Sequence, residues 1–295
     1  MTLNSTLQRV SRRGLRQRGL PGWVGALPLL MFLALFLILP IAANVVTSFW
    51  VNGAFSFSAM AQLLEPQYLD AFIQTFNLSL LTAAVGGVLG LLLAWALATG
   101  RKPAWLQNLV LSFSAVASQM GGVALAFAFI ATLGVQGFAT QAILGLTGWD
   151  LSQDIQLASF SGLALVYLYF QIPLMAILML PAFGALKKQW QEAANSLGAS
   201  RLRYLLDIAL PIMWPSIAGS LLLLFANSFG AYATAYALAG GRVNLVPILI
   251  GFFISGDVMN DESFAAALVT GMVVVVVAAM GLRSLAERKA NRWLR

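Results

Sequence analysis

The sequence contains no cysteine and no histidine among its 295 residues. Without cysteine, a disulfide, an iron–sulfur cluster or a thiolate metal site is excluded. Without histidine, a Ser-His-Asp triad, a His-ligated zinc site and a haem held by histidine are excluded as well. Charge is also scarce, at 9% of residues, whereas 60% are hydrophobic. Because a soluble fold needs polar residues to cover its surface, the chain is predicted to be an integral membrane protein.

Long intervals without charge predict an all-α fold with six membrane-spanning helices. A bilayer core about 30 Å thick is crossed by about 20 helical residues, and a charge at its centre costs about 2.5 kcal/mol or more. The segments 51–64 and 134–149 are too short and too polar to add a span, and the apolar segment 243–256 is expected to enter the membrane only partway. Helices are expected near residues 26–48, 72–98, 106–133, 158–181, 212–238 and 264–283.

The basic residues fall almost entirely on one side of these six spans. Of 17 Lys and Arg residues, only Arg242 lies on the opposite side. By the positive-inside rule the basic side is cytoplasmic, so both termini are expected there. The chain then divides into a basic N-terminal segment (1–25), a six-helix membrane domain (26–284) and a basic tail (285–295). The N-terminal charges suit anionic lipid headgroups, and no nucleic-acid partner is expected.

The stretch 182–211, between the fourth and fifth spans, is the longest cytoplasmic segment. Apolar residues recur every three or four positions over 186–197, which predicts an amphipathic helix. Gly198 is expected to end it, and Ser200 to cap a second short helix that Pro211 closes before the next span. Periodicity alone favours a helix that lies on the membrane surface without a protein partner.

The residue identities in this stretch carry a more specific signal. Seven positions match the pattern EAA, three residues, G, nine residues, I-x-L-P without a gap, and the chance of such a match is below about one in a million. The matching residues are Glu192, Ala193, Ala194, Gly198, Ile208, Leu210 and Pro211. This pattern resembles the EAA signature of permease subunits of binding-protein-dependent ABC importers. The six spans resemble the type I architecture of that family. Within the family, the sequence resembles permeases of the spermidine/putrescine type in particular.

The resemblance implies a role and partners for the stretch 182–211. In the family it forms a coupling helix seated on a cytoplasmic ATPase, and Glu192 would offer that ATPase a charge. Ala193 and Ala194 would allow close approach of the ATPase backbone, while Gly198 would set the bend. The implied partners are two ABC ATPase subunits, a second permease (a copy or a homologue) and a periplasmic or lipid-anchored substrate-binding protein, all at the bacterial inner membrane.

The chain itself is expected to be a transport subunit rather than an enzyme. It has no G-x-x-x-x-G-K-[ST] phosphate loop, so it is expected to bind no cofactor, with ATP and Mg²⁺ held by the ATPase subunits. An ion-coupled secondary transporter is the first alternative, but the span centres lack ionisable residues and no repeat is evident. An intramembrane protease is the second, but no histidine or acidic pair is available within the spans.

Polar residues at membrane depth are candidates for the translocation pathway. Helix packing is the alternative explanation for small hydroxyl residues, and it is favoured for Ser112, Ser114 and Thr234. Gln171 and Pro173 are expected to interrupt the fourth span. The pathway candidates are Asn227, Ser228, Tyr232 and Tyr236 of the fifth span and Gln119 of the third.

The external segments carry seven acids against Arg242 alone. This excess leans toward a cationic solute, although the positive-inside rule by itself leaves acids behind on that side. A polyamine is therefore one candidate substrate. The sequence also resembles related permeases for ferric iron, sulfate, thiamine or phosphonates, so these solutes remain alternatives. The external acids are Glu65, Asp70, Asp150, Asp154, Asp257, Asp261 and Glu262.

Overall fold

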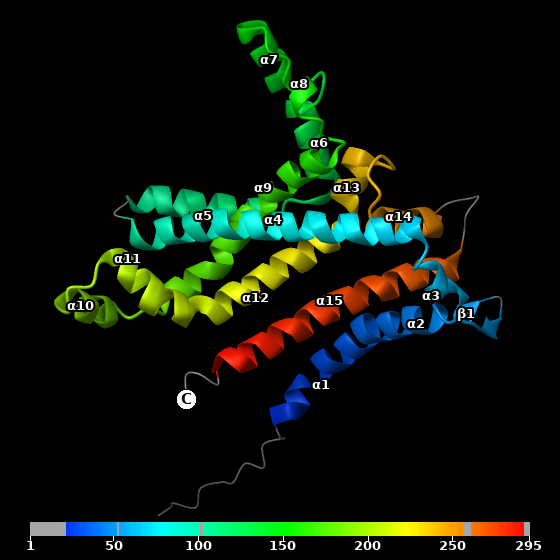
Figure 1. Cartoon of the computed structure of the whole chain (residues 1–295), viewed down its shortest axis with the longest axis horizontal. Helices are drawn as coiled ribbons and strands as arrows, with labels where there is room; N and C mark the ends of the chain where they lie inside the picture. Colours follow the sequence, from blue (N-terminus) through cyan, green and yellow to red (C-terminus); the bar gives the residue numbers. More distant parts are fainter. Residues whose placement is uncertain (1–21, 52, 101–102, 256–260, 292–295) are drawn as a thin grey trace, which may run out of the picture.

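The computed structural model describes residues 22–51, 53–100, 103–255 and 261–291, so most of the two basic ends, Arg101, Lys102 and Asp257 lie outside the described residues. The described chain is helical except for one hairpin and its loops, which confirms the all-α prediction (Figure 1). The hairpin pairs β1 (Trp50–Val51) with β2 (Ala54–Phe55) in antiparallel fashion. The α-helices are α1 (Gly22–Leu33), α2 (Leu39–Thr47), α3 (Ser58–Gln62), α4 (Pro66–Thr99), α5 (Ala104–Gln119), α6 (Gly122–Leu133), α7 (Phe138–Thr147), α8 (Leu151–Asp154), α9 (Phe160–Gly184), α10 (Lys188–Ser196), α11 (Arg201–Tyr204), α12 (Leu210–Phe229), α13 (Tyr232–Ala239), α14 (Val246–Ser255) and α15 (Glu262–Asn291).

Within the described residues, six helical segments are long and apolar enough to cross a membrane, which confirms the expected number of spans. α14 has 10 residues and is too short to cross, as predicted for the segment 243–256. The six segments are Gly25–Thr47, Pro66–Thr99, Gly122–Thr147, Phe160–Gly184, Leu202–Phe229 and Glu262–Gly281.

The third span differs from the prediction of one helix over 106–133. The chain forms α5, breaks at Gly121, and continues as α6 in a different direction (Figure 1). Gly122 begins α6 with φ +72°, a conformation that favours glycine because it carries no Cβ. The apolar stretch that is long enough to cross a membrane therefore runs through α6 and α7. It includes part of the segment 134–149, which the sequence predicts to be too short and too polar for a span.

The fifth span is also broken, whereas a single helix over 212–238 was expected. α12 ends at Phe229 and α13 starts at Tyr232. The hydroxyl of Tyr167 donates a hydrogen bond to the carbonyl oxygen of Ala231 at 2.8 Å. A carbonyl freed by the break is therefore satisfied by a side chain of α9, as a buried backbone group in a membrane requires.

Two prolines stand inside continuous helices where each follows a wide turn. The π-helical segment η1 (Ala34–Ile38) precedes Pro40, and η2 (Leu205–Ala209) precedes Pro211. A proline ring clashes with the carbonyl four residues earlier, and a widened turn makes room for it. The expectation that Pro211 closes a helix was therefore wrong, since the chain stays helical from α11 through η2 into α12.

Pro173 likewise does not interrupt the fourth span. α9 is continuous over 25 residues with Pro173 inside it. Neighbouring helices stabilise such a position because they enclose the carbonyl group that loses its partner. Pro173 and Gln171 are both buried in this structure.

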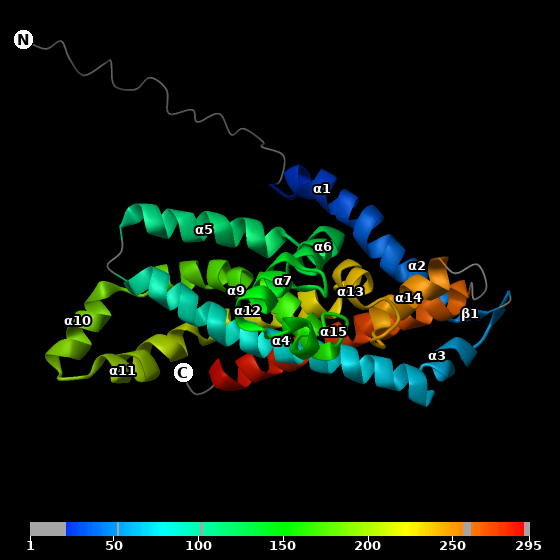
Figure 2. The same ribbon diagram turned by 90° about the horizontal axis from the view of Figure 1, so that it is seen from above.

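The core of the molecule lies where α4 packs against α9 and α12 (Figure 2). Glycines on α4 allow the close approach. A Cβ added to Gly86 would lie 2.7 Å from Cβ of Gln171, and one added to Gly90 would lie 2.5 Å from the carbonyl oxygen of Ile172. Small residues at such contacts let membrane helices approach until van der Waals packing and hydrogen bonds hold them.

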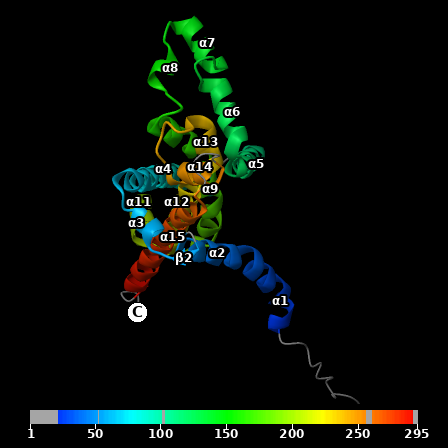
Figure 3. The same cartoon turned by 90° about the vertical axis from the view of Figure 1, so that its right-hand side faces the viewer.

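Two parts of the chain extend away from this core. No residue of the first span between Gly25 and Thr47 is buried, and α1 lies apart from the other helices (Figure 3). α6, α7 and α8 together form a limb that projects from the helical body, with α6 at its base (Figures 1 and 3). We refer to these three helices as the limb. Its base packs against α13.

Candidate functional site

α10 ends in a turn that requires glycine. Gly198 has φ +76°, in the left-handed region. Its N–H donates to the carbonyl of Asn195 at 3.0 Å, and the N–H of Ala199 donates to the carbonyl of Ala194 at 2.9 Å. These two bonds form a Schellman motif, which satisfies the last carbonyls of a helix. The predicted bend at Gly198 is therefore present and has a defined backbone geometry.

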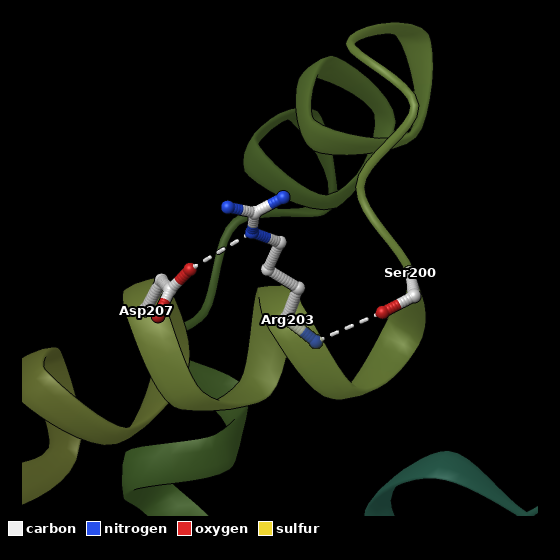
Figure 4. Close-up of polar contacts among 3 residues, drawn as sticks. All are labelled: Ser200, Arg203 and Asp207. Atoms are coloured by element: carbon white, nitrogen blue, oxygen red, sulfur yellow. Dashed lines mark hydrogen bonds and ion pairs between the residues drawn. The ribbon is translucent and has the colours of Figure 1, made fainter.

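The second half of the turn is held by two local contacts, which Figure 4 shows. The hydroxyl of Ser200 accepts a hydrogen bond from the N–H of Arg203 at 3.2 Å, confirming the predicted cap of the second helix. Nε of Arg203 lies 3.5 Å from Oδ2 of Asp207, one helical turn further on. This exposed ion pair adds little stability. Together the contacts position α11 directly after the bend and continuous with α12.

The motif residues lie at one end of the molecule, on α10 and on the helix that leads into α12 (Figure 1). Glu192 and Ala193 are exposed, whereas Ala194 is 4% exposed and packs within its own chain. Ala193 is therefore open to the close approach expected of a partner backbone, whereas Ala194 is covered by its own chain. Glu192 lies 3.5 Å from Lys188 in an exposed pair, so its carboxylate stays accessible. Ile208 and Leu210 are half-buried and Pro211 is exposed.

Leu197, which ends the apolar periodicity of the predicted helix, is strongly exposed in this site. The periodicity assigned it to the apolar side of the helix, yet the structure leaves it 88% exposed at the tip of the turn beside Gly198. Leu202, on the other side of the turn, is 64% exposed. A contiguous exposed apolar patch marks a contact with another protein or with a membrane, whereas single exposed apolar residues are common on any surface. Periodicity identifies a helix face, but it does not say which molecule covers that face.

The pathway candidates lie around the breaks in the third and fifth spans. Asn227 is on the last turn of α12, Tyr232 and Tyr236 are on α13, and Gln119 is the last residue of α5; all four are exposed. The rings of Tyr232 and Tyr236 stack with centroids 5.4 Å apart. The structure therefore brings polar and aromatic groups together near the two breaks.

Ser228 does not belong to that exposed set. It is 3% exposed, and its hydroxyl lies 2.9 Å from the hydroxyl of Thr82 on α4. Its assignment to the pathway is therefore corrected to a helix-packing contact, the role expected for small hydroxyl residues. Thr82 was not singled out in the sequence, although its hydroxyl in an apolar segment was the available signal. Ser114 and Thr234 are also buried, in line with the packing role expected for them.

Gln171 forms a second polar contact in the core, between α9 and α12. It is fully buried, and its Nε2 donates to the carbonyl oxygen of Leu224 on α12 at 2.9 Å. Its Oε1 has no hydrogen-bond partner among the described residues. An amide donor satisfied across two spans holds α9 and α12 in register, while the unpaired oxygen costs about 1–3 kcal/mol.

The acids of the limb are bound by their own segment. The hydroxyl and N–H of Ser152, followed by the amide of Gln153, donate to Asp150 and hold the pKa of that carboxyl below its usual value. Oδ2 of Asp154 accepts a hydrogen bond from Nε1 of Trp149 at 2.7 Å. Both carboxylates therefore stabilise the local fold of α8 and its flanking turns.

The sequence is similar to permease subunits of known transport systems. The chain is 27% identical over 270 residues to the spermidine/putrescine transport system permease protein PotB of Escherichia coli (strain K12), covering 89% of this chain and 95% of PotB. It is 28% identical over 228 residues to the sulfate transport system permease protein CysT of the same organism, covering 76% and 77%.

Solved structures share the fold at low sequence identity. A bacterial ABC transporter involved in the import of the acidic polysaccharide alginate matches with a TM-score of 0.70 at 18% identity, over 92% of this chain and 94% of the other. The MetNI methionine ABC transporter matches with a TM-score of 0.59 at 17% identity, over 79% and 98%. Residues 86–292, which include the EAA-type motif, match the family described as the binding-protein-dependent transport system inner membrane component. The chain belongs to this family of multi-pass inner-membrane proteins and is a permease subunit of an ABC importer.

Proposed function

We propose that this permease forms half of the pathway for a small solute and is driven through the turn between α10 and α11. One observation carries the coupling proposal: Leu197 is exposed beside the Schellman turn of Gly198, within the EAA-type motif. An exposed apolar side chain held by a rigid turn is suited to a pocket on a partner protein. In this proposal the turn docks on a cytoplasmic ATPase, with Glu192 and Ala193 beside it.

The orientation that this proposal requires has both termini and the α10–α11 turn in the cytoplasm. Sixteen of the 17 basic residues fall in segments that would then be cytoplasmic, which supports it through the positive-inside rule. The hairpin of β1 and β2, the part of the limb around α8 and the loop before α14 would face the outside.

Several partners follow from this assignment. The sequence has no phosphate loop, so two ATPase subunits would supply the nucleotide sites with ATP and Mg²⁺, and this chain would hold no cofactor. A second permease, identical or homologous, would complete the pathway. The unburied first span supports a partner or lipid along that face. A substrate-binding protein, periplasmic or lipid-anchored, would deliver the solute, as the family description implies.

The exposed polar residues near the helix breaks are proposed to line the pathway. Asn227, Tyr232, Tyr236 and Gln119 flank the breaks of the third and fifth spans, where the backbone is irregular. In a membrane, irregular backbone is tolerated where it is buried in protein or lines a water-filled cavity. The exposure of these four residues within one subunit favours the cavity.

A polyamine is the proposed substrate class. The match to the spermidine/putrescine permease covers 89% of this chain, compared with 76% for the sulfate permease. The external segments are acidic apart from Arg242, and such a field attracts organic cations.

The test is reconstitution of the complete importer in proteoliposomes. This chain purified alone is expected to hydrolyse no ATP, and measurable turnover would contradict the assignment of nucleotide sites to separate subunits. With its ATPase subunits, second permease and binding protein, it is expected to take up labelled spermidine when ATP is present. Uptake of labelled sulfate with no uptake of spermidine would overturn the substrate proposal and leave the coupling proposal intact.

A further inference from the structure

A cavity of about 500 Å³ lies between the base of the limb and the end of α13. In Figure 1 the limb rises beside α13, away from the end that carries α10 and α11. Polar residues line it from the segment around α8, and Arg242, an exposed residue three positions beyond the end of α13, lines it from the other side. The polar lining residues are Ser152, Gln156 and Arg242, and the apolar ones include Leu133, Ile155 and Leu238.

Arg242 is the one basic residue outside the segments assigned to the cytoplasm. Among the described residues no carboxylate lies within ion-pair distance of its guanidinium, since both ion pairs found there involve the α10–α11 region. The two acids nearest to the cavity in sequence are already bound: Asp150 accepts from Ser152, and Asp154 accepts from Trp149. The positive charge at this cavity is therefore uncompensated within the described chain.

The surroundings of the cavity make this charge distinctive. The remaining charges on the same side of the membrane domain are acidic, and those described are Glu65, Asp70, Asp150, Asp154, Asp261 and Glu262. A carboxylate that approaches this face is repelled by most of the surface and attracted at one point. A single attractive point in a repulsive field fixes the register of a docking partner more than it adds affinity.

We propose that this cavity receives a carboxylate side chain from one lobe of the substrate-binding protein, with Arg242 as its ion-pair partner and the side-chain amide of Gln156 as a hydrogen-bond donor. The proposal rests on the proposed function, which places this face outside the cell and assigns a binding protein to it. Arginine suits the role because its planar guanidinium binds a carboxylate through two parallel hydrogen bonds. The cavity is large enough for one acidic side chain and the tip of the loop that carries it.

The experiment measures ATP hydrolysis by the complete importer in nanodiscs while the concentration of its binding protein is varied. Arg242→Gln is expected to raise the half-saturating concentration of the binding protein about tenfold, which corresponds to about 1.4 kcal/mol. The maximal rate and the rate without binding protein are expected to stay unchanged. Those two rates also report that the variant is folded and assembled. Gln67→Glu is the matched control, because it changes the charge of the exposed outer surface by the same amount outside the cavity, and less than a twofold shift is expected.

The partner carboxylate is found by charge exchange. In the Arg242→Glu importer, exposed acids on the lobes of the binding protein are replaced one at a time by lysine, and one replacement is expected to restore the half-saturating concentration. An unchanged half-saturating concentration in Arg242→Gln would overturn the proposal. So would a loss of solute uptake with normal dependence on the binding protein, because that result assigns Arg242 to the solute. If the wild-type importer shows no stimulation by any binding protein, the proposed function itself fails, and that outcome is distinct from both.

Discussion

The side chain of Thr234 and the backbone of Gly122 hold the two broken spans together. The N–H of Gly122 donates to Oγ1 of Thr234 at 2.7 Å, and that hydroxyl lies 3.3 Å from the carbonyl oxygen of the same glycine. Gly122 is the first residue of α6, whose N–H has no partner within its own helix. A residue of α13 therefore caps α6, and the break in the third span is coupled to the helix that follows the break in the fifth.

Thr234→Val is expected to destabilise the protein by about 1–3 kcal/mol, because it keeps the side-chain shape and leaves the N–H of Gly122 without its acceptor. Thr234→Ser keeps the hydroxyl and is expected to stay near the wild type. Thermal unfolding of the purified chain in detergent measures the difference. Equal stabilities of the two variants would show that the bond between α6 and α13 contributes nothing.

Gly198→Val is expected to abolish ATP-dependent uptake while the protein remains inserted in the membrane. A residue with a Cβ costs about 1–2 kcal/mol in the left-handed conformation, so the Schellman turn is expected to open and Leu197 to move from its exposed position. Membrane fractionation measures insertion, and uptake in proteoliposomes measures coupling.

The control for that turn is Gly184→Val at the end of α9. An added Cβ at Gly184 meets nothing within 4 Å, and Gly184 is not among the positive-φ glycines. This variant is expected to transport normally. Normal uptake by Gly198→Val would contradict the coupling role of the turn, and equal losses in both variants would assign the effect to valine rather than to backbone geometry.

The number of spans could be predicted from sequence because the cost of a buried charge leaves visible charge-free intervals. The breaks at Gly121 and Gly230 could not, because a break inside an apolar run changes no charge and depends on partners far along the chain. Gly122 is stabilised by Thr234, and Ala231 by Tyr167. Such long-range hydrogen bonds leave no local pattern, although glycine in an apolar span was a signal that the helix could change direction.

The candidate site likewise contains one feature that could be predicted from sequence and others that could not. The bend at Gly198 follows from local backbone chemistry and was read from sequence. The effect of Pro211 was misread, because its ring is accommodated by the wide turn of η2 within a continuous helix. Ser228 was misassigned because a hydroxyl looks the same in a sequence whether it lines a pathway or packs against Thr82. The position of the neighbouring helix α4 is needed to decide between a pathway role and a packing role for Ser228.

Single cysteines test the pathway directly, since the natural chain contains none. Asn227→Cys and Tyr232→Cys are expected to react with a membrane-impermeant thiol reagent in the assembled importer, at rates that change between nucleotide states. Ser228→Cys is the matched control, because it is adjacent to Asn227 and buried against Thr82, and it is expected to stay unlabelled. Absence of labelling at Asn227 and Tyr232 in every nucleotide state would assign both residues to packing.

Gly90→Leu tests whether the close contact between α4 and α9 supports the membrane domain. A Cβ at Gly90 would lie 2.5 Å from the carbonyl oxygen of Ile172 and 2.5 Å from Cβ of Met175, so a side chain there forces the helices apart. Overpacking of this kind costs about 1–3 kcal/mol, and lower thermal stability in detergent is expected.

Gly145→Leu is the control for that contact, because Gly145 lies in α7 of the limb with nothing within 4 Å of an added Cβ. Its stability is expected to stay near the wild type. Since α9 also carries Gln171, whose amide is bonded to Leu224 of α12, separation of α4 from α9 is expected to disturb that link too. A Gly90→Leu protein as stable as Gly145→Leu would mean that the three helices tolerate a wider spacing, and the close packing would then have another role than stability.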